Sequence, residues 1–244
     1  MTCEGYFGHR TRIYELDLYN QPEKIAPLIK KSYDLGIRAM NLPNDPSILD
    51  ALDILKDDGI EMKIIGTIGH TKVNYLMPDF NKAREEADYI TDIEILSNYD
   101  TPVMLVDDML VDAYDWEFTS KILEEIKDQG IIPGLITSRT FNTTKEILSG
   151  KIDTDLFDFY MLPINKVAYT MDVDFFVDSE KDELSNLLNQ LDKNIIVSRL
   201  LACGIQRPQE AFNFFKTLDY ADMACVSVAS QREAEETFGV LKDL

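Results

Sequence analysis

Two adjacent aspartates end a strongly apolar segment of this 244-residue chain and are candidates for acid/base chemistry. The segment is Pro102–Asp107 (PVMLVD), and Asp108 follows it directly. Because neighbouring residues of a strand point to opposite faces, we expect only one of Asp107 and Asp108 to face the interior of the fold. A carboxylate buried there would have a raised pKa and could act as a general base. The structural alternative is an acid that caps a loop amide or pairs with Arg139 or Arg199.

His70 is the second candidate for proton transfer, in the segment GTIGHTK. The chain has only two histidines, and neither an HxH nor an HxxxH spacing accompanies His70, so we predict no metal site. The alternative for His70 is an ordinary loop histidine. Lys166 is a further candidate, for Schiff-base chemistry, if its side chain is removed from water.

A group of small and polar residues near the carboxyl end of the chain is a candidate binding site for phosphate. In the segment VSVASQREAEET, Ser230 is placed as an N-cap with Glu233 three residues later, as in a capping box. A helix N-terminus there would offer free backbone N–H groups to an anion. The alternative is a terminal helix that is merely well capped. The residues we predict to bind a cofactor or phosphate are Ser227, Ser230, Gln231, Arg232, Arg199 and Asn165.

The elements that must position these side chains alternate between short β-rich runs and amphipathic helical stretches. Eight strands are predicted, at Arg12–Tyr19, Arg38–Leu42, Glu61–Ile68, Pro102–Asp107, Ile131–Thr137, Asp158–Ile164, Asn194–Arg199 and Met223–Val228. Helices are predicted at Pro22–Lys31, Ser47–Lys56, Asn81–Ser97, Glu117–Gln129, Thr143–Leu148, Glu180–Leu191, Gln209–Leu218 and Gln231–Leu241. This order predicts an α/β fold, a single (β/α)₈ TIM barrel of parallel strands over residues 1–244, with residues 1–11 as an N-terminal tail. An open, doubly wound sheet is the alternative, but eight strands in this length favour closure.

In such a barrel the active site lies at the carboxyl ends of the strands. Polar residues follow nearly every predicted strand there, and they are Asn41, Asn44, Asp45, His70, Asp107, Asp108, Ser138, Arg139, Asn165, Lys166, Arg199, Ser227 and Ser230. Whether the loop from His70 to Phe80 acts as a lid is left open.

Composition restricts the partners. The net charge is −20, from 44 acidic and 24 basic residues. A field of this sign repels nucleic acid and anionic lipid, so we predict a small-molecule ligand and neither a nucleic acid nor a membrane partner. The three scattered cysteines and the absence of an apolar leader favour reduced thiols in a cytoplasmic protein.

Several segments, in order, resemble the aldo-keto reductase superfamily. They are IAPLIKKSYDLGIRAMNLPND, KIIGTIG, ILSNYDTPVMLVDD, GLITSRTFNTTKEI, FDFYMLPIN and, most similar of all, residues 194–241 with IIVSRLLACGI, EAFNFF and ACVSVASQREAEETF. The resemblance covers most of the chain and rests on order and spacing. It implies a barrel with a phosphate-binding end at Ser227, Ser230, Gln231 and Arg232.

The reductase chemistry of that family uses an Asp–Tyr–Lys–His tetrad, which delivers a hydride from NADPH and a proton from the tyrosine. In this chain the aspartate position falls on Asn41 and the tyrosine position on about Pro46. The lysine position falls on Ile68, and the histidine position on Asp107 or Asp108. The Ser-Asn pair that holds the nicotinamide falls on Ile136 and Thr137. The resemblance therefore implies an inherited fold without the standard carbonyl reduction. Binding of the cofactor NADPH stays open, although the tetrad and the nicotinamide contacts are replaced.

Three functions stay open from the sequence. The first is an aldo-keto-reductase-like barrel that binds a nucleotide or phosphorylated small molecule at its C-terminal face. The second is a lyase or isomerase in which Asp107 or Asp108, with His70 and Asn41 nearby, does acid/base work on a small carbonyl compound. The third is a non-catalytic barrel that acts through protein contacts.

Overall fold

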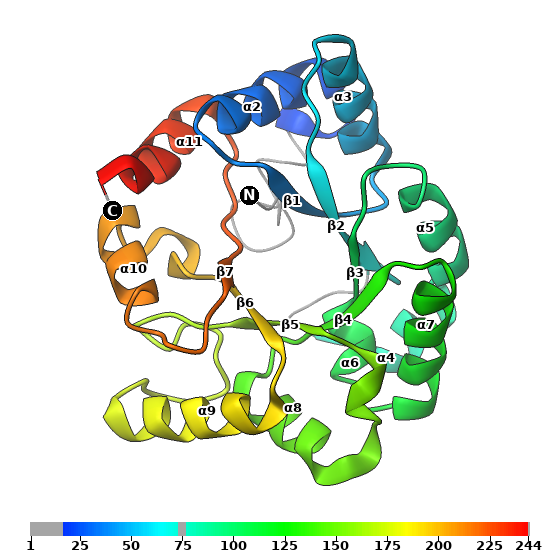
Figure 1. Ribbon diagram of the computed structural model, residues 1–244, viewed down its shortest axis with the longest axis vertical. Helices are drawn as coiled ribbons and strands as arrows, with labels where there is room; N and C mark the ends of the chain where they lie inside the picture. Colours follow the sequence, from blue (N-terminus) through cyan, green and yellow to red (C-terminus); the bar gives the residue numbers. More distant parts are fainter. Residues whose placement is uncertain (1–16, 73–76, 244) are drawn as a thin grey trace.

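The computed structural model describes residues 17–72 and 77–243. Over these residues seven parallel strands form one sheet in chain order (Figure 1). The strands are β1 (Ala39–Pro43), β2 (Lys63–Ile68), β3 (Val103–Val106), β4 (Ile132–Ile136), β5 (Phe159–Pro163), β6 (Asn194–Ser198) and β7 (Met223–Ala224). The sheet curls around a common axis, and the helices lie on its outer face (Figure 1). All carboxyl ends of the strands therefore meet at one rim, where the site is built.

Helices connect the strands. They are α2 (Pro22–Asp34), α3 (Pro46–Asp57), α4 (Phe80–Glu86), α5 (Tyr89–Leu96), α6 (Asp108–Val111), α7 (Trp116–Asp128), α8 (Thr140–Glu146), α9 (Asp178–Leu191), α10 (Pro208–Phe215) and α11 (Gln231–Phe238). Shorter helical turns occupy Ile147–Lys151, Thr154–Leu156, Ala202–Gly204 and Gly239–Asp243. No helix in the described ranges combines the length and the apolar character that a membrane crossing demands.

The predicted alternation of parallel strands and helices is confirmed. Seven of the eight predicted strands correspond to β1–β7. The remaining one, Arg12–Tyr19, lies largely outside the described residues, and its described end is helical at 17–18 and a turn at 19–20, not a strand. The closed eight-stranded barrel therefore stays a prediction, while a curled, seven-stranded α/β sheet is what the structure has. The predicted N-terminal tail, residues 1–11, also lies outside the described part.

Local chemistry moved several predicted boundaries. The single helix predicted for Asn81–Ser97 is two helices, because Asp88 interrupts it and accepts a hydrogen bond from the amide of Thr91 as the N-cap of α5. The last predicted strand, Met223–Val228, pairs with β6 only at Met223–Ala224. The short helix α6, directly after β3, was not predicted, and its placement shapes the site.

Two apolar cores hold the curled sheet in place. The larger lies between the sheet and the helices, and the smaller lies inside the curl and consists of Val103, Leu105, Ile136, Met161, Ile196 and Cys225. Burial on both faces explains why the strands read as nearly continuous apolar runs. The inner space is tight at Gly134, where an added Cβ would collide with Leu105 and lie 2.7 Å from the carbonyl oxygen of Phe159. The inner face of the curled sheet is thus closely packed at β3, β4 and β5.

Candidate active site

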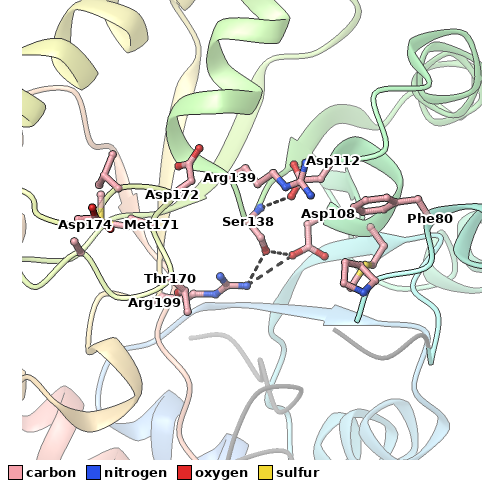
Figure 2. A pocket seen from close by; sticks show the side chains of 14 residues that line it. Phe80, Asp108, Asp112, Ser138, Arg139, Thr170, Met171, Asp172, Asp174 and Arg199 are labelled. Atoms are coloured by element: carbon pink, nitrogen blue, oxygen red, sulfur yellow. Dashed lines mark hydrogen bonds and ion pairs between the residues drawn. The ribbon is translucent and has the colours of Figure 1, made fainter. Parts of the chain in front are cut away.

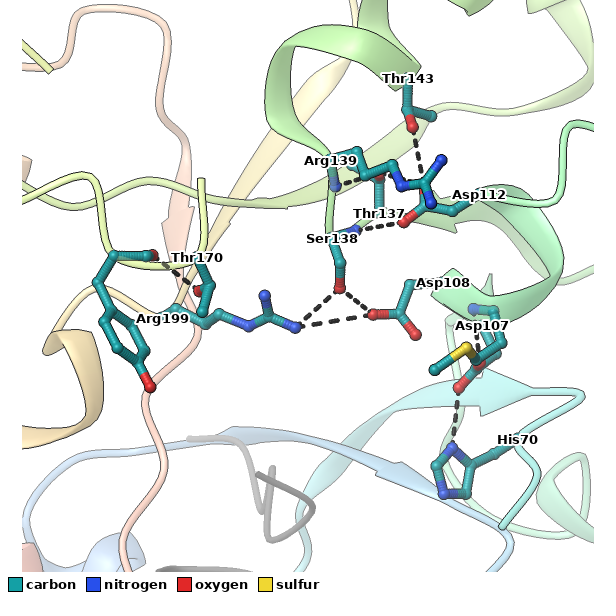
Figure 3. Close-up of polar contacts among 12 residues, drawn as sticks. His70, Asp107, Asp108, Asp112, Thr137, Ser138, Arg139, Thr143, Thr170 and Arg199 are labelled. Atoms are coloured by element: carbon teal, nitrogen blue, oxygen red, sulfur yellow. Dashed lines mark hydrogen bonds and ion pairs between the residues drawn. The ribbon is translucent and has the colours of Figure 1, made fainter. Parts of the chain in front are cut away.

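The turn from β3 into α6 sends the two adjacent aspartates in different directions (Figure 3). Asp107 is the N-cap of α6 and accepts a hydrogen bond from the amide of Met109 at 2.9 Å. Its other oxygen lies 2.8 Å from Nδ1 of His70. Asp108 instead points toward Ser138 and Arg199. Both structural roles weighed for these acids, helix capping and pairing with Arg199, are thus present, one at each residue.

Asp108 lies in a buried polar triad with one residue from the end of β4 and one from the end of β6. The hydroxyl of Ser138 donates a hydrogen bond to Asp108, and Nη2 of Arg199 donates to Ser138 Oγ at 2.8 Å. The same Nη2 lies 3.7 Å from Asp108 Oδ2, and both side chains are about nine-tenths buried. Burial and the charge of Asp107 raise the pKa of Asp108 to about 7, although Arg199 and Ser138 oppose the shift. Asp108 therefore changes its protonation near neutral pH.

A second buried acid, Asp112, stands one helical turn beyond Asp108. It accepts hydrogen bonds from Thr137 Oγ1 at 2.5 Å, Thr143 Oγ1 at 2.7 Å and the amide of Ser138 at 2.9 Å. Burial raises its pKa, and these bonds oppose the shift. Asp112 thereby anchors the start of the β4–α8 loop that carries Ser138. Sequence reasoning missed it, although a helix that begins at Asp108 would place both acids on one face.

These side chains form part of the wall of a pocket of about 630 Å³ (Figure 2). A volume of this size suits a small-molecule ligand. Its lining comprises Pro78, Phe80, Asp108, Met109, Asp112, Ser138, Arg139, Ala168, Thr170, Met171, Asp172, Val173, Asp174 and Arg199. Three of these residues, Ala168, Thr170 and Arg199, have left-handed backbone conformations, with φ of 57°, 53° and 53°. Such strain at non-glycine residues concentrates at functional sites.

His70 stands beside this triad but does not line the pocket. Burial alone would lower its pKa, but the hydrogen bond to Asp107 and the charges of Asp107, Asp108 and Asp92 outweigh burial and raise it. Asp92, on α5, also accepts a hydrogen bond at 2.8 Å from the amide of Gly69, whose φ is +78°. A buried acid far along the chain therefore fixes the turn that presents His70. The loop from His70 to Phe80, which the sequence offered as a lid, includes residues 73–76, and these lie outside the described part.

Two predicted site residues instead fix local structure. Asn41 is buried on β1, and its Nδ2 donates to the carbonyl of Ile65 and to Thr67 Oγ1 at 2.8 and 2.9 Å. Asn165 is fully buried after β5 and bonds through both ends of its amide to the backbone of Tyr169. It thus holds the loop that forms one side of the pocket. The side chain of Lys166 is exposed, so the desolvation that Schiff-base chemistry requires is missing.

The predicted phosphate-binding end does not join the pocket. Ser230 caps α11 as predicted, and its Oγ accepts the amide of Glu233 at 3.1 Å. Arg232 is highly exposed and its Nε pairs with Glu236 at 2.8 Å. Of the six residues predicted to bind a cofactor or phosphate, Arg199 is the one that lines the pocket. Phosphate binding at Ser227, Ser230, Gln231 and Arg232 stays a prediction. Within the described residues, no three His, Cys, Asp or Glu side chains gather in a group that could hold a metal ion.

Comparison with known proteins supports the fold class and does not show a family or a function. No family model and no curated protein matches this sequence. Among solved structures, two of a candidate aldo-keto reductase from Pseudomonas aeruginosa are similar with TM-scores of 0.59 and 0.60, each at 16% identity. They cover 90% and 94% of this chain and 80% and 88% of their own. An N-acetylmannosamine-6-phosphate 2-epimerase from Clostridium perfringens is similar with a TM-score of 0.54 at 14% identity, covering 93% of this chain and 87% of its own. The chain therefore has a TIM-barrel-like α/β fold, and the resemblance to reductases is shared with an epimerase.

Proposed function

We propose that this chain is an acid/base enzyme that moves a proton on a small carbonyl compound, with Asp108 as the group that accepts and returns the proton. The observation that carries the proposal is the position of Asp108, buried on the wall of a ligand-sized pocket and 3.7 Å from the guanidinium of Arg199. The pKa of about 7 adds that both protonation states are populated near neutral pH. A general acid or base is most effective when its pKa lies near the working pH.

The chemistry that this arrangement serves is the isomerisation of an α-hydroxycarbonyl compound, in which the carbonyl group moves by one carbon. The Asp108 carboxylate takes a proton from a carbon next to the substrate carbonyl, and the electron pair of that C–H bond moves onto the carbonyl oxygen. When that carbon carries a hydroxyl group, the product of this step is an enediolate. The protonated Asp108 then gives its proton to the former carbonyl carbon, while the hydroxyl proton moves to the former carbonyl oxygen, so that the former hydroxyl oxygen becomes the new carbonyl oxygen and Asp108 is again a carboxylate. The positive charge of Arg199 stabilises the negative charge that develops in this step.

Supporting residues hold Asp108 ready for this role. Ser138 bridges Asp108 and Arg199, and the amide of Ser138 is itself held by Asp112. A catalytic group needs such fixed neighbours, because a small misplacement of the reacting atoms costs rate steeply. Closure of the curled sheet into a complete (β/α)₈ barrel is part of the same proposal, since barrel enzymes build their sites at this rim.

The nucleotide-binding function foreseen from the sequence is the competing proposal. It differs from the first because it requires α11 and not Asp108. A titration with NADPH, followed by thermal unfolding, distinguishes the two, because ligand at about 100 times its Kd adds about 2.7 kcal/mol of stability.

The direct test is hydrogen exchange in D₂O. The protein is incubated with a panel of 2-oxo acids, hydroxyketones and sugar phosphates, and loss of the C–H signal next to each carbonyl is followed by proton NMR. We expect exchange with at least one compound, and a loss of roughly 100-fold or more in Asp108→Asn, the scale of general acid/base catalysis. Asp128→Asn, an exposed acid on α7, is the control. Exchange that persists in Asp108→Asn, or NADPH binding with no exchange at all, would overturn the proposal.

A further inference from the structure

One cation on the pocket wall is not used by the proposed proton transfer. Arg139 lines the pocket from the start of α8, half-buried, and makes no salt bridge with any carboxylate of the described residues. Among the other arginines of the described residues, Arg84 pairs with Asp115 and Arg232 pairs with Glu236, whereas Arg38 bonds to backbone carbonyls at the chain surface. In a protein of net charge −20, a guanidinium that faces a pocket without a carboxylate partner is unusual.

The side chain of Arg139 is held by aromatic rings. Its guanidinium carbon lies 5.3 Å from the centre of the Phe80 ring and 5.9 Å from that of Tyr114. Tyr114 is in turn fixed, because its hydroxyl lies 3.2 Å from Thr143 Oγ1 and its ring stacks on Trp116 at 5.8 Å. Rings orient a guanidinium without neutralising its charge.

The backbone of Arg139 is fixed as well. Its amide donates to Thr137 Oγ1 at 2.9 Å, and that hydroxyl donates to the buried Asp112. The side chain therefore starts from a rigid point and passes between two rings. Little conformational entropy remains to be lost when a ligand binds it.

Nearby acids that could compete for Arg139 have other partners. Asp112 accepts three hydrogen bonds, and Asp108 is bound to Ser138 and paired with Arg199. Asp172 accepts the amides of Phe141 and Asn142 at 2.8 and 2.7 Å, at the start of α8. Burial alone would lower the pKa of Arg139, but the charges of Asp112 and Asp172 still act on it and help to raise that pKa. Neither acid forms a salt bridge with Arg139 within the described residues, so its paired N–H donors can meet an anion that enters the pocket.

We propose that Arg139 binds an oxyanion of the ligand, a carboxylate or a phosphate, and so restricts this pocket to small anionic carbonyl compounds. The inference rests on the proposed function for the reacting carbonyl, but the anion site is a separate property of Arg139. A guanidinium presents paired N–H donors that match the two oxygens of either group. Phe80 and Tyr114 position the donors, and Asp108 lies on the same pocket wall.

Anion binding is measured by isothermal titration calorimetry with two probes, malonate and inorganic phosphate, at constant ionic strength. We expect at least one to bind, and Arg139→Gln to weaken it by roughly tenfold or more, as for a charge-assisted hydrogen-bond pair. Arg139→Lys should recover only part of the affinity, because an ammonium lacks the fork of donors. The probe that binds better identifies the ligand as a carboxylate or a phosphate.

Arg84→Gln is the matched control, because Arg84 also lies over an aromatic ring, that of Phe118 at 4.9 Å, but is already paired. Equal binding in wild type, Arg139→Gln and Arg84→Gln, or no binding of either probe, would overturn the inference. Binding is also measured in Asp108→Asn, where we expect it to persist. Anion binding that depends on Arg139 without any hydrogen exchange would sink the proposed function alone. Exchange whose KM is unchanged in Arg139→Gln would sink the anion site alone.

Discussion

Two regions, the ends of β3, β4 and β6 and the start of α11, carry the side chains predicted to bind a ligand. The polar side chains of these two regions have different environments in the structure. At the ends of β3, β4 and β6, acids and a guanidinium from distant parts of the chain are buried together on a pocket wall. At the start of α11, Ser230 and Glu233 bond to their own helix terminus, and Arg232 pairs along the helix in solvent. The first arrangement is costly, because it buries charge and raises the pKa of Asp108, whereas the second satisfies local backbone groups.

The two regions differ in whether charged side chains are buried. On the proposed function, the buried charges of Asp108 and Arg199 mark the site, whereas the position at α11 where barrels often bind phosphate does not. A carboxylate buried beside a second carboxylate lowers stability, and such costly arrangements cluster at functional sites. A capped helix terminus is explained by stability alone.

The largest expected effect separates the two adjacent acids. Asp108→Asn should lower the hydrogen-exchange rate by roughly 100-fold or more, because the proton acceptor is removed. Asp107→Asn should cost far less, because Asp107 lies outside the pocket and its roles are to cap α6 and to contact His70. Rates for both variants on the same substrate test this. Equal losses would show that His70 and Asp107 share the chemistry.

The next effect concerns stability, and its sign is opposite to that of activity. The pKa of Asp108 is about 7 in the fold and about 3.9 in an unfolded chain, so the folded state holds a proton that the unfolded state has lost. Stability therefore falls as the pH rises from about 4 to 7, and Asp108→Asn should remove this loss. We expect Asp108→Asn to be more stable than wild type at pH 8 by a few kcal/mol, with the gain vanishing near pH 4.

Urea unfolding of both proteins across this pH range measures the gain, and Asp128→Asn serves as the control. A variant that is less stable than wild type at pH 8 would mean that the ion pair with Arg199 outweighs the cost of burial. The pocket wall would then be a structural network, and its contrast with α11 would disappear.

A smaller effect on stability is expected from helix capping, which occurs in both regions, at the start of α8 and at the start of α11. Asp172 caps α8 from a loop about 30 residues away, through two amide hydrogen bonds. Asp172→Ala should cost about 1 kcal/mol and also weaken ligand binding, because the cap holds one pocket wall against another. Asp174→Ala, which also lines the pocket, is the matched control, measured by thermal unfolding and by the same calorimetry. Equal effects of the two variants would contradict the capping role.

Local spacing was enough to predict what depends on local structure. The alternation of strands and helices and the N-cap at Ser230 follow from contacts within a few residues. The reason given for the divergence of Asp107 from Asp108 was wrong, because β3 ends at Val106 and the two acids part at the start of α6, not by alternation along a strand. The fold class followed too, because strands buried on both faces leave an apolar signal that does not depend on their partners.

The sequence placed Asp108, Ser138 and Arg199 at one rim and offered Arg199 as a partner for the acid, but it did not give the contacts that join all three. Ser138 meets Asp108 across 30 residues, and Arg199 meets Ser138 across 61. Asp112 was missed because α6 is only four residues long, and so short a helix leaves no hydrophobic periodicity in the sequence. Which side chains meet at the ends of β3, β4 and β6 depends on the register of the strands and on the curvature of the sheet. The pattern of apolar and polar residues does not determine either one at the level of single residues.

The smallest expected effect tests the other side of the comparison, at α11. Ser230→Ala removes the hydrogen bond to the amide of Glu233 and should cost about 1 kcal/mol, which lowers the Tm by about 2–4 °C in a chain of this size. Hydrogen exchange and anion affinity should stay within experimental error, because Ser230 does not line the pocket. Glu233→Gln, which keeps the shape of the side chain that accepts the amide of Ala229, should lower the Tm less. A loss of ligand binding in Ser230→Ala at unchanged Tm would give the start of α11 a binding role and reverse the assignment of the two regions.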